Sequence, residues 1–169
     1  MTSDKIYAIY PDGQDRLWIG TDNGLTIMEI SSETFTQYLS DPNDPQSLSN
    51  STVYCIYGDK VGNIWLATDY GVNRYEPSTG GFIHYTHNEM DTTTLIHNEI
   101  LSFHEDKLGN LWIGTYGKGL DKFNIQKQTF THFNGIRQLA TAVIYGILED
   151  DPGNLWLSTN NGILKFCPD

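Results

Sequence analysis

The sequence has little cysteine, little positive charge and no long apolar run. Cys55 and Cys167 are the only cysteines among 169 residues, too few for a disulfide scaffold and too dispersed for a zinc site, so we expect both to be structural. Ten Lys and Arg stand against 21 Asp and Glu, a net charge of −11, which repels phosphate backbones and anionic lipid headgroups. The longest apolar stretch, residues 142–148, is far shorter than the ~20 residues of a membrane-spanning helix. We therefore expect no nucleic-acid partner and no direct membrane contact.

The usual motifs of catalysis and phosphate binding are also absent from the sequence. There is no Gly-x-Gly-x-x-Gly, P-loop, His-Glu-x-x-His or Gly-x-Ser-x-Gly. The sequence thus favours a protein that is not an enzyme, with no cofactor and no metal site. Its 38% apolar and 12% aromatic residues still suffice for a folded core. The length fits one compact domain over residues 1–169, or part of a larger one.

The four tryptophans reveal an internal repeat. Trp18, Trp65, Trp112 and Trp156 are separated by 47, 47 and 44 residues, a period typical of repeat architectures. The third copy reads Gly-Asn-Leu-Trp-Ile-Gly-Thr over residues 109–115, and the other copies align with it. Each copy also has an Asp six residues before its Trp and a Gly that follows its Trp before an apolar residue.

Each copy contains short apolar runs bounded by Gly, Asn and Asp, which predicts antiparallel strands joined by tight turns. No segment shows a sustained helical period. Four such strands in about 40 to 50 residues are typical of a β-propeller blade. We therefore predict an all-β propeller fold with about four four-stranded antiparallel blades, a partial ring whose last blade lacks its outer strand, with blades at residues 6–38, 53–85, 100–133 and 144–166.

The repeated positions have structural interpretations. We expect the turn aspartates to accept backbone N–H bonds between the first two strands and each Trp to wedge against the adjacent blade. A small residue recurs in the innermost strand, where neighbouring strands crowd near the axis. His84 and His132 occupy one position of the outermost strand in successive copies, so we expect a role in the scaffold for both. The aspartates are Asp12, Asp59, Asp106 and Asp150, and the small residues are Ala8, Cys55, Ser102 and Gly146.

These residues resemble the two-component regulator propeller repeat. The third copy from Glu105 to Thr115 is nearly ideal, the linker over residues 41–50 is similar to the connection between blades in that family, and the resemblance covers essentially the whole chain. It implies a seven-bladed propeller in the extracytoplasmic, periplasmic sensor region of a bacterial hybrid histidine kinase or related regulator. The implied role is signal reception, with the kinase outside this chain.

Four copies are about half of a seven-bladed ring, which leaves three alternatives open. The chain can be an excised arc, it can close as four blades, or two chains can pair as a homodimer that forms an eight-bladed ring. Exposed blade faces and strand edges invite association with another chain. No fourth strand for the last copy precedes Ile6 in the sequence, so strand exchange within the chain cannot complete that blade.

The turns between the second and third strands vary most between copies. We expect them on the same face as the long connections between blades, residues 39–52, 86–99 and 134–143. Variable loops on a rigid scaffold are the usual arrangement of a binding site. Aromatic, amide and carboxylate groups there suit a small ligand such as a glycan or peptide. The candidate ligand-binding residues are Asp22, Asp69, Tyr70, Tyr116, Lys118 and Asn160.

His104 breaks the repeat, because other copies have Tyr or Leu at its position. With Glu105 it could face the central channel, as His and Glu do in a propeller lyase that inactivates streptogramin antibiotics with Mg²⁺, an analogy of fold alone. A lyase-like enzyme is therefore one alternative, and a protein–protein interaction platform is another. The preferred hypothesis is a non-catalytic sensor or ligand-recognition module.

Overall fold

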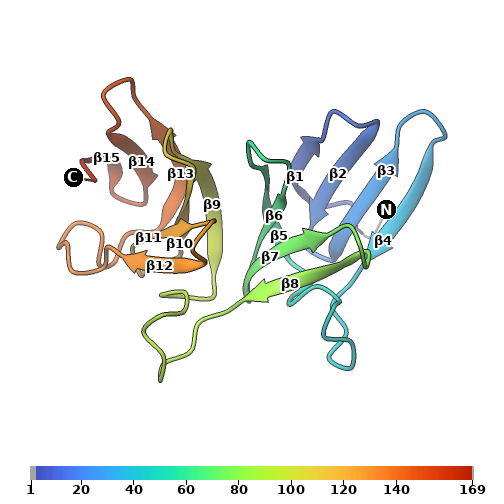
Figure 1. Cartoon of the computed structure of the whole chain (residues 1–169), viewed down its shortest axis with the longest axis horizontal. Coiled ribbons are helices and arrows are strands. Elements are labelled where there is room, and N and C mark those ends of the chain that lie inside the picture. The colour runs from blue at the N-terminus through green and yellow to red at the C-terminus, as the bar shows by residue number, and fades with distance from the viewer. Residues whose placement is uncertain (1–2, 169) are drawn as a thin grey trace. The chain divides into compact units, whose positions relative to one another are not determined.

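The computed structural model describes residues 3–168 and contains only strands as regular elements in that range (Figure 1). They form three four-stranded sheets and one three-stranded sheet, each in sequential antiparallel order. The first two sheets contain β1 (Ile6–Pro11), β2 (Arg16–Thr21), β3 (Gly24–Glu29), β4 (Thr34–Tyr38), β5 (Val53–Gly58), β6 (Ile64–Thr68), β7 (Gly71–Glu76) and β8 (Gly81–Tyr85). The other two contain β9 (Ile100–Glu105), β10 (Asn110–Thr115), β11 (Leu120–Asn124), β12 (Thr129–His132), β13 (Ile144–Glu149), β14 (Leu155–Thr159) and β15 (Gly162–Phe166). The predicted all-β, four-bladed architecture is confirmed.

The chain divides into two compact units, Met1–Tyr85 and Thr86–Asp169. Each contains two consecutive blades, and each is described by itself below. Within residues 3–168, no helix is long and apolar enough to cross a membrane.

The turn between the first two strands of each blade is built on its Asp. In the third blade, Asp106 Oδ1 accepts the N–H groups of Leu108 and Asn110, both at 2.9 Å, and Oδ2 accepts Trp112 Nε1–H at 2.9 Å. The corresponding Trp–Asp bonds measure 3.0, 2.9 and 3.0 Å in the first, second and fourth blades. The expected N–H acceptor role of the aspartates is confirmed, and each also holds its Trp ring in place.

Neighbouring blades interlock through small residues. In the first unit, a Cβ added to Gly20 would lie 2.8 Å from Val53 Cγ1, so the missing side chain makes room for the start of the second blade. In the second unit, Ile144 lies in the same way against Gly114, and Ser102 Oγ–H donates to Ile144 O at 2.9 Å. Gly20 and Gly114 lie on the second strands, opposite Ala8 and Ser102 of the innermost strands. Of the small inner-strand residues that the sequence predicted to be crowded, Ser102 thus contacts the next blade.

Tryptophan packs across the same interfaces. Trp18 meets Tyr75 of the second blade edge to face at 5.0 Å between ring centroids, and Trp112 meets Phe166 of the fourth at 5.9 Å. Edge-to-face pairs of this kind stabilise by ~0.5–1.5 kcal/mol beyond the area that they bury. The expectation that each Trp wedges against the adjacent blade is confirmed at these two interfaces.

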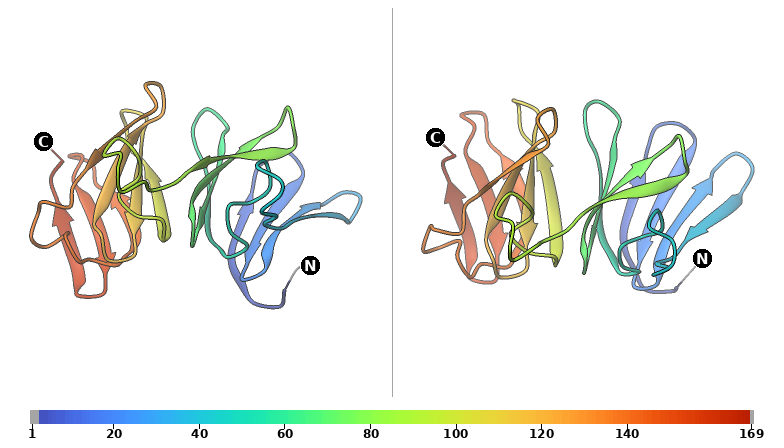
Figure 2. Two further views of the ribbon diagram at one scale, coloured as in Figure 1. Left: turned by 90° about the horizontal axis from the view of Figure 1, so that it is seen from below. Right: turned by 60° about the horizontal axis from the view of Figure 1, so that its bottom comes forward.

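The long connections fold against the blade that they enter (Figure 2). Ser49 N–H donates to Asn73 Oδ1 at 2.8 Å on β7, and Ile96 N–H donates to Asp121 Oδ2 at 2.8 Å at the same position of β11. Each connection also buries one leucine, Leu48 or Leu95. The connections are therefore fixed parts of the fold.

The histidines of the outermost strands also hydrogen-bond to these connections. His84 Nε2 lies 2.7 Å from Ser47 O, and His132 Nε2 lies 2.8 Å from Thr92 O. His132 Nδ1 also lies 2.6 Å from the buried Asp121 carboxylate. Thr92 O can only accept, so Nε2 carries hydrogen, and the hydrogen bond with Asp121 raises the pKa of His132, which favours the imidazolium. The scaffold role expected of the two histidines is confirmed.

Candidate functional site

A bulge recurs near the start of the innermost strand of every blade. The pairing skips one residue directly after Ile6, Val53, Ile100 and Ile144. A bulge leaves its extra residue unpaired and turns that side chain out of the ordinary alternation, which is why bulges are frequent beside binding sites. The displaced residues are Tyr7, Tyr54, Leu101 and Tyr145.

In the first unit, the two bulge tyrosines form an aromatic pair beside charged groups. The rings of Tyr7 and Tyr54 lie 5.2 Å apart, and Lys5 Nζ lies 5.1 Å from the centroid of the Tyr7 ring. A hydrogen bond with Tyr7 raises the pKa of Lys5, which keeps the amine charged. The turn of Asp22 adjoins this group, because Asp22 N–H donates to Lys5 O at 3.3 Å. An aromatic pair, a cation and the Asp22 carboxylate, whose charge acts on Lys5, thus lie where the first and second blades adjoin.

The turn of the first blade also adjoins the end of a long connection. Gly24 N–H donates to Ser51 O at 2.5 Å, and Gly24 has a φ of +106° that favours glycine at this turn. Within this unit, the variable turn and the connection lie on one face, as the sequence predicted.

In the second unit, three turn residues gather around the end of the connection over 134–143. Tyr116 pairs with Val143 in an isolated bridge, and Asn160 Oδ1 accepts Val143 N–H at 3.0 Å from the other side. Lys118 is exposed in the same turn as Tyr116, and the bulge residue Tyr145 follows two positions after Val143. Both tyrosines are more than half exposed, at 53% for Tyr116 and 58% for Tyr145.

The six predicted site residues are divided between the two units. Asp22, Asp69 and Tyr70 lie in the first unit, with Asp69 half-buried and the others exposed. Tyr116, Lys118 and Asn160 lie in the second unit and are exposed. The structure brings Tyr116 and Asn160 together at Val143 and places Asp22 next to Lys5.

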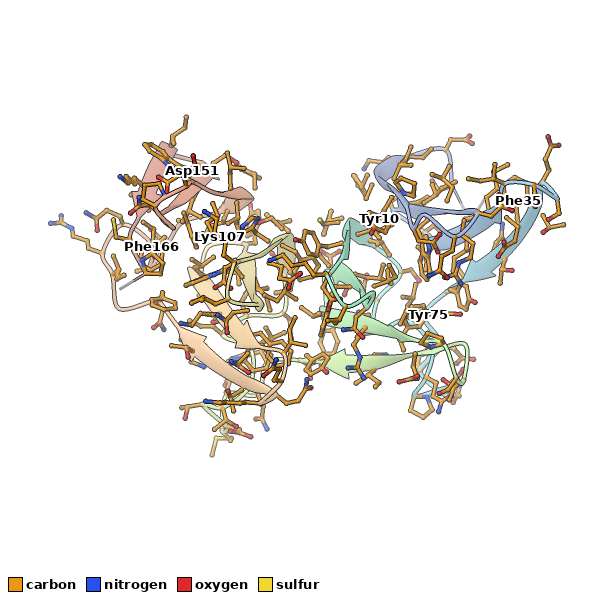
Figure 3. All side chains as sticks on the ribbon, turned by 45° about the horizontal axis from the view of Figure 1, so that its top comes forward. Tyr10, Phe35, Tyr75, Lys107, Asp151 and Phe166 are labelled. Atoms are coloured by element: carbon orange, nitrogen blue, oxygen red, sulfur yellow. The ribbon has the colours of Figure 1, made fainter. Side chains whose placement is uncertain are left out.

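His104 lies at the interface of the third and fourth blades. Its Nε2 atom is 3.6 Å from Glu149 Oε2 on the innermost strand of the fourth blade, so it packs against that blade, whereas the sequence analysis placed it in the central channel. Lys107 reinforces this interface, since its Nζ donates to the carbonyl oxygens of Asp150 and Asp151, both at 2.9 Å (Figure 3). Within residues 3–168, no group of three or more His, Cys, Asp or Glu side chains is placed to hold a metal ion. The surroundings of His104 are those of a contact between blades.

The bulge tyrosines were not among the site residues predicted from the sequence. Their signal was present, because three of the four copies carry Tyr directly after the first apolar residue of the innermost strand. If side chains along the strand are assumed to alternate strictly, these tyrosines are assigned to the wrong side of the sheet. Only the register of the paired strands shows that the pairing skips them.

The fold and the turn chemistry define a β-propeller. The chain belongs to the two component regulator propeller family, whose model matches residues 1–23, 47–70, 94–117 and 138–161. The resemblance seen in the sequence is thereby confirmed.

Solved structures point to the same class of protein. The extracellular domain of BT3049 from B. thetaiotaomicron, described as a hybrid two-component system, superposes with a TM-score of 0.84 at 26% identity over 100% of this chain and 23% of that chain. The corresponding domain of BT4673 from the same organism gives a TM-score of 0.79 at 26% identity over 98% of this chain and 21% of that one. This chain therefore spans about a quarter of the length of these relatives. It has no match among curated proteins.

Virginiamycin B lyase from Staphylococcus aureus is also similar in fold, with a TM-score of 0.66 at 15% identity over 97% of this chain and 56% of that one. At that identity the likeness extends to the propeller alone.

Proposed function

We propose that this chain is part of the extracytoplasmic, non-catalytic ligand-recognition propeller of a bacterial two-component signalling protein. Its family and its likeness to extracellular domains of hybrid two-component systems support this role. The interblade surroundings of His104 and the absence of catalytic motifs favour recognition over catalysis.

The observation that carries the proposal is the cluster of Tyr7, Tyr54, Lys5 and Asp22. The flat face of a sugar ring packs well on tyrosine, while its hydroxyl groups hydrogen-bond to an amine and a carboxylate. A peptide offers the same combination through an aromatic or polar side chain. The ligand class is accordingly a glycan or a peptide. Tyr70 is a further aromatic contact on a variable turn of the first unit, and Tyr116 is the aromatic contact on a variable turn of the second unit.

Recognition becomes a signal when the ligand binds one arrangement of the protein more tightly than another. Bound ligand would change how propellers or subunits pack, and the kinase region of the parent protein would respond. The rigid connections fit this mechanism, because a fixed scaffold transmits a local contact with little loss to flexibility.

Arrays of oligosaccharides and short peptides test the proposal on the 169-residue chain. For any probe that binds, the double variant Tyr7→Leu, Tyr54→Leu should weaken affinity by roughly tenfold or more, because it removes two aromatic faces. The variant Phe35→Leu, which changes an exposed aromatic residue on the outer strand β4, is the matched control and should leave affinity unchanged.

A second double variant, Tyr70→Leu with Tyr116→Leu, examines the turns predicted from the sequence. Loss of affinity only there would move the site from the bulges to the turns. If neither array yields a bound probe, or if both double variants bind as tightly as the unmodified chain, the proposed recognition role is wrong.

A further inference from the structure

Interfaces between blades follow one pattern in this chain. The preceding blade presents a hollow at a pair of small residues, and the following blade fills it with the first residue of its innermost strand. Val53 fills the hollow at Gly20, and Ile144 fills the one at Gly114. Both inserted residues are completely buried.

The fourth blade presents the same kind of hollow with nothing in it among the described residues. Gly146 and Ser158 are the paired small residues, opposite each other in the sheet. The hollow measures about 350 Å³, and its lining is largely apolar. Leu148 and Ile163 on its margin are 65% and 77% exposed. We name this surface the socket face, defined by Gly146, Ile147, Leu148, Trp156, Leu157, Ser158 and Ile163.

The first blade presents the matching insert. Ile6 and Ile9 occupy the positions of Val53 and Ile56 in the second blade, yet they are 41% and 59% exposed where Val53 and Ile56 are buried. We name this surface the knob face, defined by Ile6, Ile9, Pro11 and Met28. Together the two faces leave apolar side chains exposed at positions that are buried elsewhere in the chain, which marks an interaction surface.

The margins of the two faces also match in polarity. At the filled interfaces, Tyr10 lies against Gly58 and His104 lies against Glu149. The corresponding pair between the fourth blade and a first blade is Leu148 with Pro11, which buries no charge. A blade that carried an acid at this position, as the fourth blade carries Glu149, would place a carboxylate against Leu148 at a desolvation cost.

The aromatic contacts give a second match. Trp18 and Trp112 each pack against an aromatic residue in the third strand of the next blade, Tyr75 and Phe166. Trp156 is 40% exposed, and Met28 holds the Tyr75 position in the first blade. A methionine thioether packs favourably against an indole ring.

We propose that the socket face of one copy of this chain binds the knob face of a second copy, by the contacts that join consecutive blades within the chain. The complex is a homodimer with two such head-to-tail contacts, in which Ile6 of each copy fills the hollow at Gly146 of the other. The inference concerns assembly and is independent of ligand recognition.

Light scattering coupled to size exclusion, over a concentration series of the 169-residue chain, measures the assembly. We expect a mass of about twice the 19.1 kDa of one chain. Ile9→Asp and Leu148→Asp each place a charge in one face at an exposed position, so each variant should fold. Each should weaken dimerisation by at least about 30-fold, as for loss of an interface hot spot. Val61→Asp is the matched control, because Val61 is an exposed apolar residue outside both faces, and it should dimerise normally.

Mixing the two variants gives the decisive observation. Ile9→Asp retains an intact socket face and Leu148→Asp retains an intact knob face, so an equimolar mixture restores one unmodified interface and should form a heterodimer of about 38 kDa, twice the 19.1 kDa chain mass. A monomer at every concentration overturns the proposal, as does a dimer that neither variant weakens. Failure of the mixture to associate also overturns the head-to-tail arrangement. Circular dichroism spectra of the variants confirm that any loss of mass is not a loss of folding.

Discussion

Removal of the Asp106 carboxylate tests whether the turn aspartates are a main source of blade stability. Asp106 and Trp112 are both buried, and the carboxylate accepts the N–H groups of Leu108 and Asn110, the Asn110 side-chain amide and the Trp112 indole. Asp106→Ala leaves several of these donors buried without an acceptor. At ~1–3 kcal/mol for each unsatisfied buried group, with partial relaxation, we expect a loss of about 3 to 5 kcal/mol in the free energy of unfolding.

Asp150→Ala is the matched control in the same unit. Asp150 accepts the corresponding bonds from Asn154 and Trp156 but lacks the bond that Leu108 donates, because Pro152 stands at that position. Trp156 is also 40% exposed, so water can replace the lost acceptor. Guanidinium unfolding followed by tryptophan fluorescence should show a clearly smaller loss than for Asp106→Ala. Equal losses in the two variants would refute the argument that burial sets the contribution of this carboxylate.

The pH dependence of Asp106 supports the same comparison. Burial by itself raises the pKa of Asp106, but the hydrogen bonds from Asn110, Trp112 and Leu108 outweigh burial and leave the pKa below its ordinary value. A carboxyl with a lowered pKa in the folded state stabilises above its unfolded pKa of ~3.9 and loses that contribution as the pH falls through the folded value. Asp106→Asn should therefore flatten the acid limb of the stability curve, provided that the variant remains folded.

Two further predictions concern the second unit. Gly114→Ala should lower the free energy of unfolding by about 1 to 3 kcal/mol, since the added Cβ would meet Ser102 Oγ and lie 2.8 Å from Ile144 Cγ2. Gly135 has no neighbour within 4 Å of an added Cβ, so Gly135→Ala should leave the free energy of unfolding unchanged in the same denaturation assay. The hydrogen bond that the His132 ring donates to the Asp121 carboxylate raises the pKa of His132. The stabilisation of the folded state by protonated His132 is therefore complete below the ordinary histidine pKa of ~6.5, and it is lost as the pH rises through the raised pKa. Asp121→Asn should remove this alkaline loss, and a pH-independent stability of the unmodified chain between 6 and 9 would contradict the imidazolium assignment.

The repeat made the architecture accessible from the sequence. Asp, Gly-Asn and Trp recur at fixed spacing, and their contacts join residues two to six positions apart, as between Asp59 and Trp65. Such short-range chemistry can be inferred without knowledge of the fold. The four-bladed β-propeller and the N–H acceptor role of the turn aspartates were therefore predicted correctly.

The candidate site was less accessible, because it depends on register and on contacts distant in sequence. The pair of Tyr7 and Tyr54 forms only when two blades adjoin and each inner strand carries a bulge. The partner of His104 is 45 residues away, at Glu149. No local pattern distinguishes such a histidine from a catalytic one, and the resemblance to the family identifies the scaffold without its contacts.

The attachment of the connections affects how such a protein can diversify. The connection over 39–52 is bonded to Asn73 and His84 of the blade that follows it, and the next connection is bonded in the same way to Asp121 and His132. The smallest segment that carries its own bonding partners thus begins at the connection and ends with the outermost strand. Duplication or recombination of segments cut at that point would transfer a loop together with its anchors, whereas a cut at the start of the innermost strand would separate them. Grafted loops should accordingly be moved between blades with their Asn or Asp and His partners.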